Sequence, residues 1–242
     1  MEIHGGNLTV YEGTYTAAYG DGIYLKTLND NDRAIVDIHN GSFKGLMTND
    51  QITSDRSGPA GSYGVKVYGY SLINIYNGEF NGQAGAACVG GASNYDYNQN
   101  RITYDANKQA EVYIYKGQFG NTMLPNDGFM IYDNSKIIFG AGGADIASLT
   151  AITCRANLAC LSVNWFSYDS AYVPTLKSCD VRIYYGTYQN GRFVGWNKGG
   201  SSSQTYIYNT NTNLTKYTYN QNAEYGDSIV YRNNNNVEYY QS

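Results

Sequence analysis

The sequence predicts an all-β fold: a single-stranded parallel β-helix, right-handed, of about six to eight coils, with irregular C-terminal coils or a cap. Three observations predict it. Strand-like alternation of apolar residues recurs along the chain, the repeats end in one shared phrase, and helical spacing is nearly absent. The 242 residues include 27 Tyr and 28 Gly but 3 Pro, and so many aromatic residues indicate a chain that folds.

The shared phrase reads apolar, any, apolar, any, any, Gly, any, aromatic. Its glycines lie 28, 37, 39 and 69 residues apart, a period typical of repeat architectures. The last gap is about two coils long, so we expect one degenerate copy inside it. The five copies end at Gly13-Thr-Tyr15, Gly41-Ser-Phe43, Gly78-Glu-Phe80, Gly117-Gln-Phe119 and Gly186-Thr-Tyr188.

Each coil combines two strands with a glycine bend. The alternation before the glycine predicts a strand, the glycine suits a bend with positive φ, and the aromatic residue is expected to point inward. A second strand precedes several copies, at Gly22–Leu25, Gly64–Val67 and Gly128–Ile131. We assign 1–196 to the β-helix and 197–242 to irregular terminal coils or a cap, with a frayed tail from Asn233. Helical spacing is plausible only over Asp145–Leu161, where Thr and Cys weaken it.

These phrases resemble the Ile-x-Gly-Gly-Thr-Phe repeats of secreted bacterial and phage right-handed β-helix proteins, a group similar to the pectate-lyase-like superfamily. The resemblance covers about Ile3 to Tyr188. It implies a surface adhesin, a carbohydrate-binding scaffold, or a polysaccharide lyase or hydrolase, located outside the cell or at its surface. No catalytic motif of such enzymes falls on specific residues here, so we name no catalytic residue and lean against an enzyme.

Composition argues against several partners. The formal charge is −4 with no basic run, which argues against nucleic acid. The longest apolar stretch, near Ala147–Cys154, is far shorter than the roughly 20 residues of a membrane span.

Met1 leads directly into a repeat, so we expect an excised fragment whose partners include adjoining coils of a longer chain or a homo-oligomer.

An aromatic row is the most suggestive candidate site. One slot, just after the last apolar residue of each strand, faces outward by strand alternation. Neighbouring members would lie about 4.8 Å apart, giving a flat surface on which sugars could stack. Cross-strand stabilisation and contact with a partner chain remain open alternatives. The residues in this slot are Tyr11, His39, Tyr76, Tyr115 and Tyr184.

Smaller features carry weaker hypotheses. Asp30 and Asp32 could ligate Ca²⁺, although a solvated turn is the favoured interpretation and no other cofactor is indicated. Asp21 is interpreted as a turn residue bonded to its own backbone.

The four cysteines, Cys88, Cys154, Cys160 and Cys179, fit no metal motif. We interpret them as small buried hydrophobes, with a Cys154–Cys160 or Cys154–Cys179 disulfide as the alternative.

Together these features favour an extracellular binding module of a bacterial adhesin or phage tail fibre, which recognises a polysaccharide or cell-surface glycan through the aromatic row and polar loops. A structural spacer or self-assembling subunit is the second hypothesis. A polysaccharide lyase or glycoside hydrolase on the same scaffold is the third.

Overall fold

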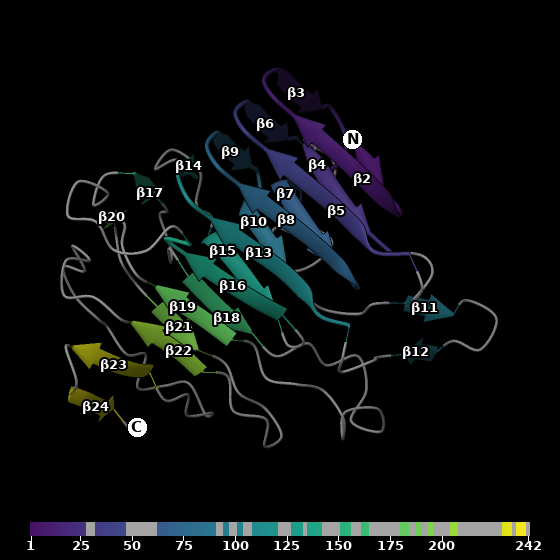
Figure 1. Ribbon diagram of the computed structural model, residues 1–242. Helices are drawn as coiled ribbons and strands as arrows, with labels where there is room; N and C mark the ends of the chain where they lie inside the picture. The colour runs from purple at the N-terminus through teal and green to yellow at the C-terminus, as the bar shows by residue number, and fades with distance from the viewer. Residues whose placement is uncertain are drawn as a thin grey trace.

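The computed structural model is all-β in the part of the chain that it describes (Figure 1). Its strands run side by side in long sheets that descend from the N-terminus to the C-terminus. The described residues are 1–27, 32–46, 62–90, 94–96, 101–103, 108–120, 127–132, 135–141, 151–155, 161–164, 180–183, 187–189, 193–195, 204–207, 229–233 and 236–240.

Three sheets, here called A, B and C, contain seven, nine and six of the described strands. Sheet A consists of β1 (Glu2–Ile3), β4 (Ile23–Lys26), β7 (Tyr63–Tyr68), β10 (Gly85–Val89), β15 (Asp127–Tyr132), β18 (Leu161–Asn164) and β21 (Phe193–Gly195). Sheet B consists of β2 (Gly6–Val10), β5 (Ala34–Ile38), β8 (Ser71–Ile75), β13 (Ala110–Ile114), β16 (Ser135–Phe139), β19 (Asp180–Ile183), β22 (Gln204–Ile207), β23 (Ile229–Asn233) and β24 (Asn236–Tyr240). Sheet C consists of β3 (Thr14–Ala17), β6 (Ser42–Gly45), β9 (Glu79–Gly82), β14 (Gly117–Phe119), β17 (Ile152–Arg155) and β20 (Thr187–Gln189).

Up to β22, each circuit of the chain adds one strand to A, then B, then C, whereas β22, β23 and β24 all belong to sheet B. Thus β1, β2 and β3 are followed by β4, β5 and β6, and each new strand pairs in parallel with the equivalent strand of the previous circuit. This arrangement is a parallel β-helix, as the repeats predicted. A short antiparallel hairpin of β11 (Asn94–Asp96) and β12 (Arg101–Thr103) projects from its side (Figure 1).

The alternation of the repeated phrase places its apolar residues inside. In sheet B one inward row passes through Val36, Ile73 and Val112, which are in register and at most 1% exposed. Sheets A and C add inward rows of their own to the same core. Packing these rows together buries the apolar faces of short strands that no single coil could stabilise alone.

The glycine of the phrase makes the bend from sheet B to sheet C. Gly13, Gly41, Gly78 and Gly117 have φ between 140° and 149°, a backbone conformation that side chains disfavour. The aromatic residue two positions later then enters the core, as predicted, and stacks on its equivalents. Ring centroids along Tyr15, Phe43, Phe80 and Phe119 lie 4.9, 5.1 and 5.0 Å apart with interplanar angles of 11° or less.

Sheets A and C approach each other at backbone distance. A Cβ atom on Gly64 of β7 would lie 2.5 Å from the backbone nitrogen of Asn81 in β9. Gly22, one coil earlier, would place its Cβ 2.8 Å from the nitrogen of Lys44. Residues without a side chain at these positions therefore allow the two sheets to close the cross-section of the solenoid.

The structure confirms one local prediction and differs from two. The degenerate copy expected after Gly117 is real, because β16 lies between β13 and β19. The helix considered over Asp145–Leu161 is wrong for Ile152–Arg155, which forms β17 because it pairs with β14; its Ile and Thr favour a strand. Within the tail predicted to be frayed, Asn236–Tyr240 forms β24, antiparallel to β23.

Candidate ligand-binding face

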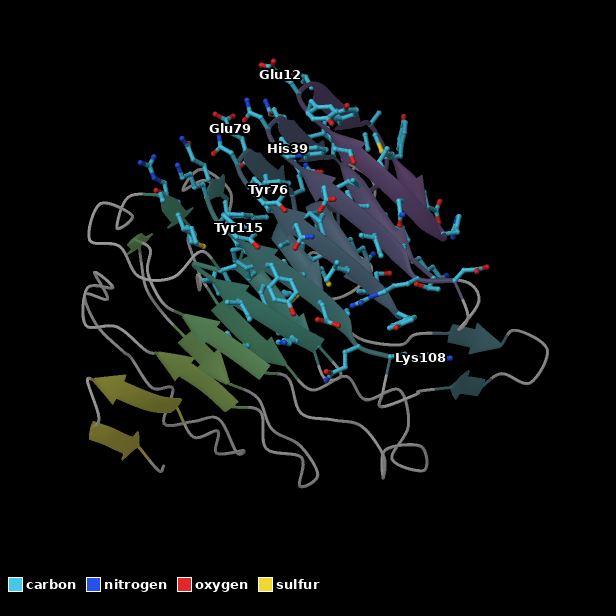
Figure 2. The ribbon with its side chains drawn as sticks, viewed as in Figure 1. Glu12, His39, Tyr76, Glu79, Lys108 and Tyr115 are labelled. Carbon is cyan, nitrogen blue, oxygen red and sulfur yellow. The ribbon has the colours of Figure 1, made fainter. Side chains whose placement is uncertain are left out.

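The outward aromatic row is present on sheet B. Tyr11, His39, Tyr76 and Tyr115 follow the last residues of β2, β5, β8 and β13, and their ring centroids are 5.0, 4.9 and 4.8 Å apart along the row. Figure 2 shows His39, Tyr76 and Tyr115 in line on the outside of the sheet. We call these four residues the outer ladder. The fifth predicted member, Tyr184, lies outside the described residues.

Backbone hydrogen bonds fix the ladder in register. The amides of His39, Tyr76 and Tyr115 each donate at 2.8 Å to the carbonyl of the last strand residue one coil earlier. Each ring is therefore the translation of its neighbour by one strand spacing. In the next coil the equivalent position is Gly140, so the aromatic row is interrupted there.

Stacking changes what the row offers to a ligand. The interplanar angles are 10°, 12° and 21°, so the faces of His39 and Tyr76 are directed at neighbouring rings. The surface predicted as a flat stacking platform therefore consists, at these inner members, largely of ring edges and polar atoms. Tyr11, at the end of the ladder, is 74% exposed, whereas Tyr76 is 37% exposed.

Polar side chains line both sides of the ladder. On one side, Asn74 Nδ2 donates to Asp37 Oδ1 at 2.8 Å. On the other, Asn77 Nδ2 donates to Asn40 Oδ1 at 3.1 Å in an exposed pair. These amides retain further donor and acceptor capacity, so they could bind hydroxyl groups of a ligand lying along the row.

The charges near the ladder are mixed and mostly acidic. Glu12 and Glu79 lie along the bend beside the ladder (Figure 2), and Asp37 lies on the opposite side. Desolvation in the stack raises the pKa of Tyr76, and the charges of Asp37 and Tyr115 raise it further. Tyr76 therefore keeps its hydroxyl proton at neutral pH and can donate a hydrogen bond.

A separate ionic group occupies the start of the same strands. Arg33 Nη2 donates to Glu111 Oε1, Tyr113 Oη donates to Glu111 Oε2 at 2.8 Å, and Lys136 Nζ donates to Tyr113 Oη at 3.1 Å. The Arg33 guanidinium also lies 4.8 Å from the centroid of the Tyr70 ring. These contacts link strands of sheet B in different coils, and they group two cations, Arg33 and Lys136, around the single carboxylate of Glu111.

The structure describes only one of the two possible calcium ligands. Asp32 is exposed, and Asp30 lies outside the described residues. Across the residues that the structure describes, no three or more His, Cys, Asp or Glu side chains converge in an arrangement that could hold a metal ion.

A second polar cluster lies on the outer face of sheet A, and sequence reasoning missed it. Asp21 Oδ2 is 3.6 Å from Lys66 Nζ, and the two side chains are 9% and 10% exposed. The hydrogen bond to Asp21 Oδ1 comes from the backbone nitrogen of Tyr63 in the next coil, at 2.8 Å, so Asp21 is not simply a turn residue bonded to its own backbone. The outward position of Lys66 within Gly64–Val67 was the one signal that could have suggested it.

Burial dominates the electrostatics of this cluster. Desolvation raises the pKa of Asp21, against the opposing effects of Lys66 and the Tyr63 amide. Desolvation also raises the pKa of Cys88 to about 12, although Lys66 lowers it and Tyr68 Oη lies 3.4 Å from its sulfur. Cys88 and Cys154 are both buried, as predicted, while Cys160 and Cys179 lie outside the described residues.

Comparison with known proteins adds no assignment, since no family model, curated protein or solved structure matches this chain. None of the described residues belongs to a helix long and apolar enough to cross a membrane.

Proposed function

We propose that this chain is a binding module that holds an extended glycan along the outer ladder, at the surface of a cell or particle. The observation that carries the proposal is a continuous row of solvent-accessible rings at one-coil spacing, lined on both sides by amide and carboxylate groups. The row extends over roughly 15 Å from Tyr11 to Tyr115, a length suited to several sugar units.

The chemistry of the row matches a carbohydrate in two ways. Exposed ring surface, greatest at Tyr11, can contact the C–H groups of a sugar, while Asn40, Asn77 and the Tyr76 hydroxyl can bond its hydroxyls. The acidic groups beside the ladder favour a neutral glycan over an acidic one, because like charges would oppose binding. The repeat resemblance and the rigid scaffold support the same class of function, and an extracellular location belongs to this proposal.

The direct test is a glycan array that includes neutral and acidic polysaccharides, followed by affinity electrophoresis on the hits. Tyr76→Ala should weaken retention about 2- to 12-fold, since a ring contact contributes about 0.5–1.5 kcal/mol. Tyr19→Ala is the matched control, because Tyr19 is 72% exposed but lies outside the ladder. Equal retention of the two variants on every hit would contradict the proposal. Repeating the array with a calcium chelator tests Asp30 and Asp32.

A structural role is the second candidate, and a specific observation favours it. The rings of the outer ladder stack on each other, so they stabilise neighbouring coils even without a ligand. In that case Tyr76→Ala would lower the melting temperature, but the variant would bind every ligand as well as the wild type does. Concentration-dependent sedimentation would identify a self-assembling subunit.

Cleavage of polysaccharides is supported by the resemblance alone, and release of reducing ends or unsaturated products from a polysaccharide panel would test it.

A further inference from the structure

The Asp21–Lys66 pair is unusual because two opposite charges lie together where both side chains are largely buried. Both side chains are at most 10% exposed, yet nitrogen and oxygen are 3.6 Å apart, longer than the roughly 2.7–2.9 Å of a well-formed charge-assisted hydrogen bond. A buried ion pair offsets its desolvation cost only when its geometry is good. Neutralising both charges would therefore relieve a substantial desolvation penalty.

The surroundings of the pair are mostly aromatic and apolar, apart from the N-terminal ammonium, which donates to the Gly22 carbonyl at 3.0 Å and lowers the pKa of Asp21. Lys66 Nζ lies 5.1 Å from the centroid of the Tyr24 ring and 5.3 Å from that of Tyr68. A separate buried cluster of Tyr63, Tyr68, Ala84, Cys88 and Met130 packs on this outer face of sheet A, with Tyr24 against it. A medium of this kind disfavours charged forms and excludes water.

The carboxyl group of Asp21 is held with its two oxygens in different roles. Oδ1 accepts the hydrogen bond from the Tyr63 amide, while Oδ2 is the oxygen nearest to Lys66 Nζ. The carboxyl carbon, Cγ, is bonded to both of these oxygens. Oδ1 is therefore polarised by a fixed backbone donor, as the carbonyl oxygen is in acyl-transfer sites, and the amine faces the other oxygen.

We propose that Lys66 and Asp21 condense to an intramolecular amide bond, a covalent cross-link between successive coils. One proton moves from Lys66 Nζ to Asp21 Oδ2, which converts the ion pair into a neutral amine and acid. The nitrogen lone pair attacks Cγ, and the negative charge that develops on Oδ1 is stabilised by the Tyr63 N–H. A second proton from nitrogen leaves with Oδ2 as water, so the ammonium and carboxylate yield one amide and one water molecule, without oxidant or cofactor.

Two features of the site favour formation of the amide: the proximity of the two groups and the exclusion of water. Two groups fixed side by side react with a very high effective concentration, and exclusion of water opposes the reverse hydrolysis. The cross-link would join the segment before β4 to strand β7, closing a loop of 45 residues between positions 21 and 66. Such a tie restricts the unfolded chain in the same way that a disulfide does, so it would make this binding module harder to unravel.

Intact-mass spectrometry of the purified full chain tests the proposal. The cross-linked protein is expected to be lighter than its sequence mass by one water, 18 Da. After trypsin, the amide blocks cleavage at Lys66, so peptide 1–26 should appear joined to peptide 57–101. A wild-type chain at its full sequence mass would overturn the proposal.

A succinimide at Asp21-Gly22 would also remove one water, so the variants must separate the two products. Lys66→Arg keeps the positive charge but lacks a nucleophilic amine, and it should have the full sequence mass and a lower melting temperature. Lys44→Arg, at an exposed lysine, is the control and should keep the 18 Da loss. If Lys66→Arg also retained the loss, or the joined peptide were absent from the digest, a succinimide would account for the mass and the cross-link would be refuted.

Discussion

Replacing Gly64 by alanine would place a methyl group where two sheets meet at backbone distance. The new Cβ would lie 2.5 Å from the nitrogen of Asn81, 2.9 Å from the carbonyl carbon of Phe80 and 3.0 Å from the carbonyl oxygen of Ala86. All three are backbone atoms in paired strands, so no side chain can rotate away to relieve the overlap. Strands β7 and β9 would have to separate instead.

Overpacking of this kind typically costs 1–3 kcal/mol, occasionally more. Because three backbone contacts are violated at once, we expect about 3 kcal/mol of lost unfolding free energy. In a chain of this size that corresponds to a fall in Tm of about 6–12 °C. Urea and thermal unfolding followed by circular dichroism would measure it.

The matched control is Gly5→Ala. Its Cβ would lie 3.2 Å from the Cβ of Asp32, an exposed residue that can shift. The free energies of unfolding of the two variants should therefore differ clearly. A difference of less than about 0.5 kcal/mol would show that the close approach of sheets A and C does not limit the size of the side chain at position 64.

Three further outcomes test the packing. Phe80→Leu removes two stacks, at 5.1 Å on Phe43 and 5.0 Å on Phe119, and should cost about 1–3 kcal/mol in urea unfolding; an unchanged midpoint would contradict it. Tyr76→Ala, which breaks two stacks, should cost about twice as much stability as Tyr11→Ala, which breaks one, in the same assay. Cys88 has its pKa raised from 9.0 to about 12, so stability that is intact below pH 9 should fall as pH rises toward 12; a Cys88→Ala variant should lack this part of the alkaline loss, and parallel pH curves for the two proteins would refute the assignment.

The repeated phrase predicted what the backbone alone determines. Strand alternation assigns each residue to one face, and a fixed period places equivalent residues one above another. From those two facts came the inward Phe43 and Phe80, the bend at Gly41 and the outward row that includes Tyr76. These features depend on position within a coil and on little else.

Features that depend on contact between different sheets or loops could not be predicted. The approach of Gly64 to Asn81 is set by how sheets A and C close the cross-section, which no periodicity encodes. The pairing of Asp21 with Lys66 joins residues 45 positions apart through a segment outside the repeated phrase. Ile152–Arg155 was open to a helical interpretation because a short apolar run has no decisive period, and pairing with β14 decided it.

The two aromatic ladders show why repetition alone does not identify a site. The stack of aromatic rings inside the core is explained by burial, because Phe43, Phe80 and Phe119 are fully buried and rings of equal shape pack well. Burial cannot explain the outer ladder, where Tyr11 is mostly exposed.

The rest of the same face sharpens this contrast. The adjacent outward row of sheet B changes from Thr9 to Asp37, Asn74 and Tyr113 along four coils in register, so folding tolerates different chemistry beside the ladder. At the ladder position the side chain remains aromatic or imidazole throughout those coils. Contact with a partner chain would also restrict it, and sedimentation tests that case; within a single chain, stabilisation by stacking and recognition of a ligand are the two causes that would restrict it in this way. Measuring both retention and melting temperature for Tyr76→Ala separates them, because stacking predicts a loss of stability without a ligand and recognition predicts a loss of affinity beyond it.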